Sequence, residues 1–133
     1  MLIQGTDAEM TWPVEQEHLA SSFGSGLADV LATPVLAGFC EECCRKMIDP
    51  DLPEGKQTVG TEIHIRHLAA TPQGMKVTVH AVLRRIDGPK LHFDVAASDE
   101  VEKVAQGTHT RFIIDTDRFS HRIDKKREEL GLA

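Results

Sequence analysis

The spacing of hydrophobic positions divides the chain into one helical region followed by a longer region of strands. Between positions 34 and 48, apolar residues recur at three- and four-residue steps, which is the period of one buried helix face. Thr33 followed by Pro34 is typical of a helix start, with the threonine as N-cap. Asp49-Pro50 ends the pattern, because proline removes a backbone donor and restricts the residue before it. The sequence therefore predicts a helix over residues 34–48.

After position 56 the period changes to two, which is the period of a strand with one buried face. The first alternating run predicts that five side chains share one strand face: Val59, Thr61, Ile63, Ile65 and His67. Further runs follow over residues 75–83, 91–95 and about 101–115, and Asp87-Gly88 is a strong hairpin signal. The connections are too short for parallel crossovers, so the strands are expected to be antiparallel.

The two ends of the chain complete the predicted order of elements. Residues 9–14 are expected to form a short strand, and residues 15–32, rich in small side chains, a short helical or lid-like segment. The charged tail over residues 117–130 is expected to be helical. A helix followed by an antiparallel meander predicts an α+β fold, with a curved sheet over one helix and a single domain spanning residues 1–133.

Charge and composition narrow the classes of partner. The chain of 133 residues has 15 Lys and Arg against 21 Asp and Glu, a formal net charge of -6. Proteins that grip nucleic acid through its phosphates normally carry a basic patch, so we expect no nucleic-acid partner. No apolar run reaches the ~18 residues of a membrane helix, and residues 1–10 lack a signal-peptide pattern. We therefore expect a cytoplasmic protein without a membrane partner.

The cysteines and two histidines suggest a metal site at first sight. Cys40-x-x-Cys43 and His64-x-x-His67 together contain the ligand set of a structural zinc. The two histidines are an odd number of residues apart on a predicted strand, so they point to opposite faces. Cys40 and Cys43 lie on the inner helix face, and with Cys44 the cysteines are odd in number, which favours reduced thiols and core packing over a metal site. A cysteine nucleophile with a distant histidine is disfavoured for the same reason.

Two further side chains stay open on the pattern alone. Glu41 lies in the helix with the apolar face, where a carboxylate needs a partner or a function. Periodicity alone favours a solvated position for Glu41, beside Glu42. His67 is either a hydrogen-bonded core histidine or a functional one.

Residues 59–74 (VGTEIHIRHLAATPQG) resemble the fluoroacetyl-CoA thioesterase family of the hot-dog fold thioesterases. The shared features are a Gly-Thr pair, a histidine six residues after that threonine, and Ala-Ala-Thr-Pro-x-Gly. Thr33 lies eight residues before Glu41, and Glu41 lies nineteen before Gly60, as the family spaces these residues. Gly-Thr-His-x-Arg at residues 107–111 also matches, so the resemblance spans roughly residues 30–120.

This resemblance implies a hot-dog fold, in which a curved antiparallel sheet wraps one long central helix. Two subunits would join edge strands, with active sites at their interface, so a homodimer or a dimer of dimers is expected. The implied activity is hydrolysis of a small acyl-CoA thioester to free acid and CoA, without a cofactor or metal. The alternatives are a non-catalytic hot-dog protein that binds acyl-CoA and, less favoured, a hydratase or dehydratase, which needs a base near the acyl α-carbon.

The resemblance also implies roles for individual residues. Thr33, Glu41 and His67 would act together as catalytic residues. The Thr33 hydroxyl would attack or orient water, and Glu41 would be the attacking carboxylate or the base for water. His67 would shuttle a proton and protonate the leaving thiolate. The Gly60 N–H would donate to the thioester oxygen, and Arg111 would contact substrate or form a structural ion pair.

Two features of the chain qualify the resemblance. Fluoroacetyl-specific members carry an aromatic lid before the catalytic threonine, whereas residues 21–27 contain one aromatic residue among several small ones. The acyl pocket is therefore expected to be gated differently, and the acyl group is left open. Because CoA is anionic and the chain is acidic, we expect a local basic strip at the pocket mouth, with Arg66, Arg84, Arg85 and Lys90 as candidates.

Overall fold

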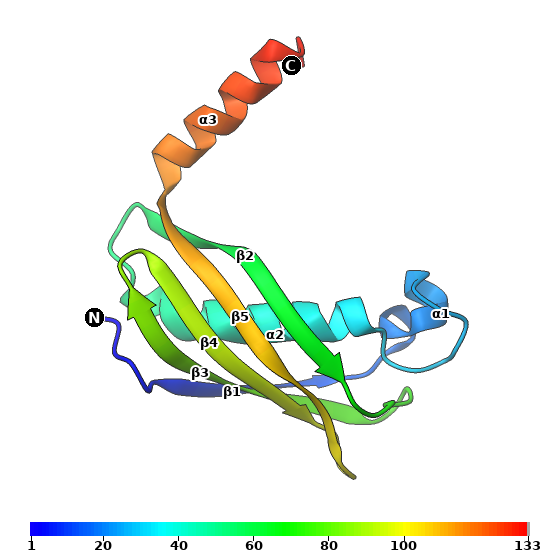
Figure 1. The fold of residues 1–133 in the computed structure, drawn as a ribbon. Coiled ribbons are helices and arrows are strands. Elements are labelled where there is room, and N and C mark those ends of the chain that lie inside the picture. Colours follow the sequence, from blue (N-terminus) through cyan, green and yellow to red (C-terminus); the bar gives the residue numbers. More distant parts are fainter. Residues whose placement is uncertain (133) are drawn as a thin grey trace.

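The computed structural model describes residues 1–132 and contains a five-stranded antiparallel sheet packed on one long helix (Figure 1). The helix, α2, spans Thr33–Ile48. The strands are β1 (Asp7–Pro13), β2 (Lys56–His67), β3 (Lys76–Asp87), β4 (Lys90–Ser98) and β5 (Lys103–Asp115). Their spatial order is β1-β3-β4-β5-β2. The predicted α+β arrangement of a curved sheet over one helix is confirmed.

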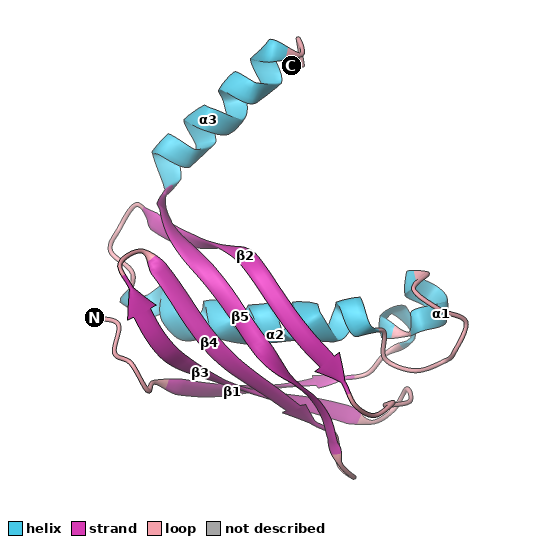
Figure 2. Cartoon of the chain, in the orientation of Figure 1, coloured by secondary structure: helices cyan, strands magenta, loops and turns pink. Residues whose placement is uncertain are grey.

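Short elements at both ends complete the chain. A 3-10 turn (η1, Gln16–His18) and a one-turn helix (α1, Ala20–Phe23) form the predicted lid-like segment before α2, and a second 3-10 turn (η2, Asp49–Asp51) follows it. The charged tail forms α3 (Thr116–Glu129), which projects away from the sheet and buries none of its side chains (Figure 2). Within residues 1–132, no helix combines the length and the apolar character needed to cross a bilayer.

The core lies between one face of α2 and one face of the sheet. The helix contributes six buried side chains: Leu36, Phe39, Cys40, Cys43, Cys44 and Ile48. The sheet contributes alternate apolar residues of β3 and β4 (Val77, Val79, Ala81, Leu83, Leu91, Phe93, Val95 and Ala97) and two adjacent residues of β5, Val104 and Ala105. The helical and strand periods thus meet in a single apolar layer, whose burial from water stabilises the fold.

The start of α2 differs from the prediction. Ala32 is the N-cap, while Thr33 is the first helical residue and makes no capping hydrogen bond. The Thr33 hydroxyl is instead hydrogen-bonded to His67 at the end of β2. The prediction of Thr33 as N-cap was wrong because a partner on the sheet competes for its side chain.

Strand β2 also departs from simple alternation. A bulge between Gly60 and Glu62 inserts an extra residue relative to β5. Before the bulge Thr58 is buried, whereas Val59 pairs with the exposed Phe112. After the bulge, the residues on the helix side are Ile63, Ile65 and His67, opposite His109, Gly107 and Ala105. The prediction of one shared face for all five residues was therefore wrong for Val59, because the bulge shifts the alternation by one residue.

Strand β2 forms one edge of the sheet. It is hydrogen-bonded to β5 along its length, and no strand of the described chain lies on its other side. Its 12 residues therefore present a row of free backbone donors and acceptors. An edge of this length is a natural surface for pairing with another strand.

Candidate active site

The first part of the site is a pair of side chains where α2 begins and β2 ends. The Thr33 Oγ1 atom lies 2.7 Å from Nδ1 of His67, a hydrogen bond between residues far apart in the sequence. Both residues line a cavity of about 370 Å³, whose other walls include Ala20, Val30 and Leu31. A hydroxyl hydrogen-bonded to an imidazole, in an open hollow whose walls include alanine, valine and leucine, is suited to act as a nucleophile with its base.

The environment of His67 favours its neutral form. Burial lowers the pKa of His67 below its ordinary value, and the nearby backbone of Ala69 offsets part of this effect. The Nε2 atom is buried and has no hydrogen-bond partner among the described residues. A neutral ring whose Nδ1 accepts from Thr33 carries its proton on Nε2. His67 is thus able to take the hydroxyl proton.

The second part of the site surrounds Glu41 in the middle of α2. Its Oε2 atom lies 3.8 Å from His109 Nε2 and 3.9 Å from Arg111 Nη1. It also lies over Gly60, where an added Cβ would come within 2.6 Å of this oxygen. The missing side chain of Gly60 therefore makes room for the carboxylate. Glu41 is half-exposed, so its position falls between the solvated and the buried alternatives.

A buried network holds this cluster in place. The Arg111 Nε donates to Thr58 Oγ1 at 2.8 Å, and its Nη2 donates to the Thr58 carbonyl at 3.1 Å. The His109 Nδ1 donates to the Glu62 carbonyl at 2.8 Å, so its Nε2 accepts from Arg111 at 3.1 Å. Burial, followed by the charge of Arg111, lowers the pKa of His109. Arg111 is buried and satisfied by protein groups, which favours a structural role over substrate contact.

The two parts are well separated within one chain. Thr33 and Glu41 are eight residues apart on α2, which is about 12 Å of helix at 1.5 Å per residue. His67 and Gly60 are seven residues apart on β2, which is about 23 Å of strand. The structure thus brings Thr33 to His67, and Glu41 to Gly60 and Arg111, but it does not bring the two groups together.

The cysteines do not supply a nucleophile. Burial raises the pKa of Cys40 to about 12 and that of Cys43 to about 11, and it raises the pKa of Cys44 as well. These thiols therefore stay protonated at neutral pH, and they pack in the core. His64 faces away from the helix while His67 faces it, so the sequence pattern of two Cys and two His does not converge in space. Residues 1–132 hold no cluster of three or more side chains suited to a metal.

His109 and Thr58 belong to the site, and sequence reasoning did not assign a role to either. His109 was part of the Gly-Thr-His-x-Arg motif, and its spacing of two from Arg111 was a signal that both side chains share one strand face. The position of Thr58 was hidden by the bulge in β2, which alternation does not reveal.

Comparison with known structures identifies the class of fold first. A hot-dog-like protein from Thermanaerovibrio acidaminovorans superimposes with a TM-score of 0.86 at 24% identity, covering 92% of this chain and 91% of the other. A fluoroacetyl-CoA thioesterase superimposes with a TM-score of 0.90 at 30% identity, covering 95% and 98% of the two chains. The fold is therefore the expected hot-dog fold.

Sequence comparison then identifies the family. Residues 14–117 match the model of the fluoroacetyl-CoA-specific thioesterase family. The chain is 38% identical over 98 residues to the fluoroacetyl-CoA thioesterase of Streptantibioticus cattleyicolor. These 98 residues cover 74% of this chain and 70% of that protein. The chain belongs to this thioesterase family, and its activity is acyl-CoA thioester hydrolysis.

Proposed function

We propose that the protein hydrolyses small, uncharged acyl-CoA thioesters at a site shared by two copies of the chain. Thr33 and His67 of one copy would face Glu41 of its partner. The observation that carries the proposal is the 2.7 Å contact between Thr33 and His67 in an open hollow, with Glu41 held elsewhere in the same chain. A second copy is the simplest source of the missing carboxylate.

The open edge of β2 supports antiparallel pairing with β2 of a second copy about a two-fold axis. Directly opposed residues of an antiparallel pair lie on the same face, which restricts the register. With the axis at His64, Ile63 would lie opposite the partner's Ile65, an apolar pair on the helix side. Glu62 would lie opposite the partner's Arg66, a pair of opposite charges on the outer side.

The same register supports a composite site. His67 would lie opposite the partner's Thr61, at the bulge that includes the partner's Gly60. Glu41 lies over Gly60 within each chain, so the partner's Glu41 would approach the pair of Thr33 and His67. The backbone N–H of the partner's Gly60, beside this carboxylate, is proposed as a donor to the thioester oxygen.

In the proposed reaction, His67 Nδ1 takes the Thr33 hydroxyl proton while Oγ1 attacks the thioester carbonyl carbon. The carbon–sulfur bond breaks, and the CoA thiolate leaves with the proton returned by His67. The partner's Glu41 then takes a proton from water, whose oxygen attacks the acyl–threonine ester. The bond to Oγ1 breaks, and that proton restores the hydroxyl as the free acid departs.

The cavity supports a small, uncharged acyl group. Its walls are largely alanine, valine and leucine, with no Asp, Glu, Lys or Arg. Solved relatives are in complex with fluoroacetate and CoA, and with acetyl-CoA. Structures of two variants of the fluoroacetyl-CoA thioesterase have also been solved. One has a phenylalanine replaced, and the other has a threonine replaced that lies six residues after that phenylalanine. Placing that threonine on Thr33 puts Leu27, which is exposed, at the phenylalanine position, so we propose no preference for fluoroacetyl-CoA.

Mixed dimers test the shared site. Glu41→Ala and His67→Ala are each expected to lose activity, and subunit exchange between them would give one intact site in each mixed dimer. In a random equal mixture, about a quarter of the wild-type activity per chain should return, because half the dimers are mixed and one of their two sites is intact. The measurement is CoA release from acetyl-CoA and propionyl-CoA with a thiol reagent.

The matched control mixes Thr33→Ala with His67→Ala. These two residues belong to the same copy in the proposed site, so no mixed dimer contains an intact pair and activity should stay absent. Restored activity in the control, or none in the first mixture despite proven exchange, would contradict the arrangement.

A further inference from the structure

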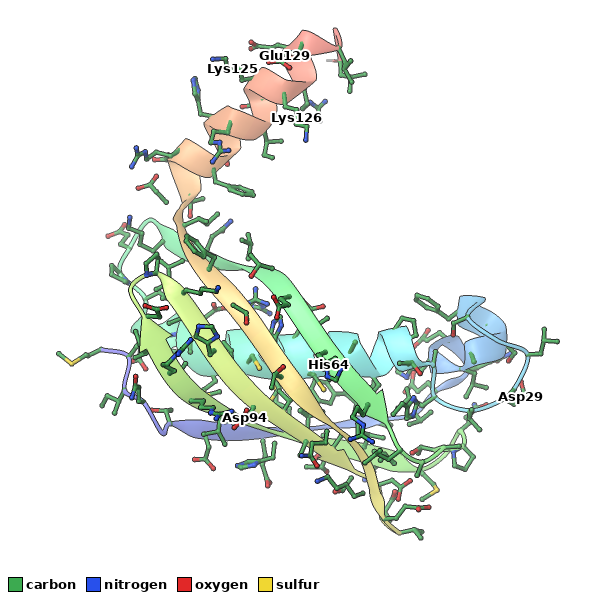
Figure 3. The ribbon with its side chains drawn as sticks, viewed as in Figure 1. Asp29, His64, Asp94, Lys125, Lys126 and Glu129 are labelled. Carbon is green, nitrogen blue, oxygen red and sulfur yellow. The ribbon has the colours of Figure 1, made fainter. Side chains whose placement is uncertain are left out.

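The face of the sheet turned away from α2 carries two adjoining hollows. The larger, of about 510 Å³, lies over β2, β5, β4 and β3, and the smaller, of about 390 Å³, lies beside it. They share Arg84, Asp94 and Thr108, so they form one continuous depression, here called the outer groove. Figure 3 labels His64 on β2 and Asp94 on β4, which lie in one cross-strand row of this face.

The outer groove is basic although the whole chain is acidic. Five cationic side chains line it: Arg66, Arg84, Arg85, Lys90 and Lys103. Two carboxylates do so, those of Glu62 and Asp94, while the formal net charge of the chain is -6. The four cations expected from the sequence to form a basic strip are all among these five. An excess of positive charge along one groove is suited to an anionic ligand.

The cations are only partly neutralised by their neighbours. Arg84 donates to Asp94 at 3.2 Å, with 67% of its own side chain exposed. Arg85 Nη2 lies 3.1 Å from His92 Nε2, and Lys103 Nζ donates to the Gln106 side chain, so neither contact supplies a negative charge. In the proposed dimer Arg66 also faces the partner's Glu62. The cations best placed for a ligand are therefore Arg84, Arg85, Lys90 and Lys103.

We infer that the outer groove binds the phosphates of the nucleotide part of CoA, an inference that rests on the proposed function. The ligand carries a diphosphate and a 3′-phosphate, which require several cations spread along a surface. The groove also adjoins the reactive pair. Arg66 and Leu68, which line it, are the immediate neighbours of His67, the last residue of β2. The pantetheine arm would pass this strand end, from the outer groove to the cavity of Thr33 and His67.

Two substrates with the same acyl group test the inference. One is acetyl-CoA, and the other is acetyl N-acetylcysteamine thioester, which lacks the phosphates. For the double variant Arg84→Gln, Lys103→Gln, the KM for acetyl-CoA should rise about tenfold or more, while the KM for the short thioester and kcat for both stay unchanged. Raising the salt concentration should weaken acetyl-CoA binding in the wild type more than in the variant.

The control is Arg122→Gln, Lys125→Gln on α3, which removes the same charge outside the groove and should leave both KM values unchanged. An unchanged KM for acetyl-CoA, or an equal rise for both substrates, would overturn the inference while leaving the thioesterase mechanism in place. If the wild-type protein hydrolysed neither substrate, that result would instead contradict the proposed function. The single variant Lys103→Gln, with a smaller rise for acetyl-CoA alone, guards against misfolding of the double variant.

Discussion

The two halves of the proposed site are built in different ways. At the start of α2, Thr33 and His67 share one hydrogen bond, and the second nitrogen of His67 is buried with no hydrogen-bond partner in residues 1–132. In the middle of α2, Glu41 lies above Gly60, next to a network in which Arg111 makes three hydrogen bonds to Thr58 and His109.

This difference matches two chemical tasks. An imidazole with few fixed partners and a lowered pKa is suited to accept and return a proton. A carboxylate beside a buried, cationic network is suited to hold one position. The end of the site with Thr33 and His67 therefore depends on the hydrogen bond between them. The end with Glu41 depends on the space over Gly60 that the carboxylate occupies. The following predictions test this contrast from the largest expected effect to the smallest.

Removing either member of the reactive pair should have the largest effect. His67→Ala or Thr33→Ala should lower kcat by about 10²–10⁴-fold, because in the proposed mechanism each removes a group that acts in the transition state. Thr33→Ser keeps the hydroxyl and should retain most of the activity. His121→Ala, on the exposed helix α3, is the histidine control and should have no effect. Steady-state kinetics with acetyl-CoA measure all four, and a His67→Ala enzyme with wild-type kcat would remove His67 from the mechanism.

Filling the space at Gly60 should have the next largest effect. The added Cβ of Gly60→Ala would lie 2.6 Å from Glu41 Oε2 and 3.2 Å from His109 Cε1, so the carboxylate must move. A displaced catalytic group is expected to cost about 10- to 100-fold in kcat/KM. Thermal melting should show a modest loss of stability, because the closest atom is the end of a flexible side chain.

Gly38→Ala is the matched control for this substitution. It adds the same methyl group on α2 with no atom within 4 Å, and it should raise stability by up to about 1 kcal/mol through helix propensity. Full activity in Gly60→Ala would show that the position of Glu41 is not tightly required.

The same contrast explains what could be predicted from the sequence. The helix over residues 34–48 and the antiparallel meander follow from local periodicity, and both were found. The pairing of Thr33 with His67 did not follow from periodicity, because 34 residues separate them and only the resemblance to a family joined them. The bulge at Gly60 also escaped prediction, since one extra residue in β2 depends on its pairing with β5.

The buried histidines predict a change with pH. Burial lowers the pKa of His67 and of His109 below the ordinary value of 6.5, so the unfolded chain takes up protons first as the pH falls. Their contribution to stability is complete above about pH 6.5 and is lost as the pH falls toward the folded-state pKa values. The kcat/KM value should likewise stay on its plateau to below pH 6.5, because His67 must be neutral to act as a base.

Melting temperatures and kcat/KM from pH 4.5 to 8 as approximate limits would measure this change. His67→Asn should reduce the pH dependence of stability, with the remainder assigned to His109. A fall in kcat/KM that begins well above pH 6.5 would show that His67 has a raised pKa, which is opposite to the effect of burial.

The smallest predicted effect concerns a connection behind the reactive pair. The buried Thr71 accepts a backbone hydrogen bond from Leu31 at 2.8 Å, and its hydroxyl donates to Asp99 at 2.9 Å. Leu31 lies two residues before Thr33, and Thr71 lies four residues after His67. These contacts of Thr71 therefore link the segments that carry both members of the pair to the β4–β5 turn. Thr71→Val should lower kcat about two- to fivefold with little change in KM, and stability by about 1 kcal/mol. Thr71→Ser should restore both, and an unchanged kcat with lowered stability would limit Thr71 to a structural role.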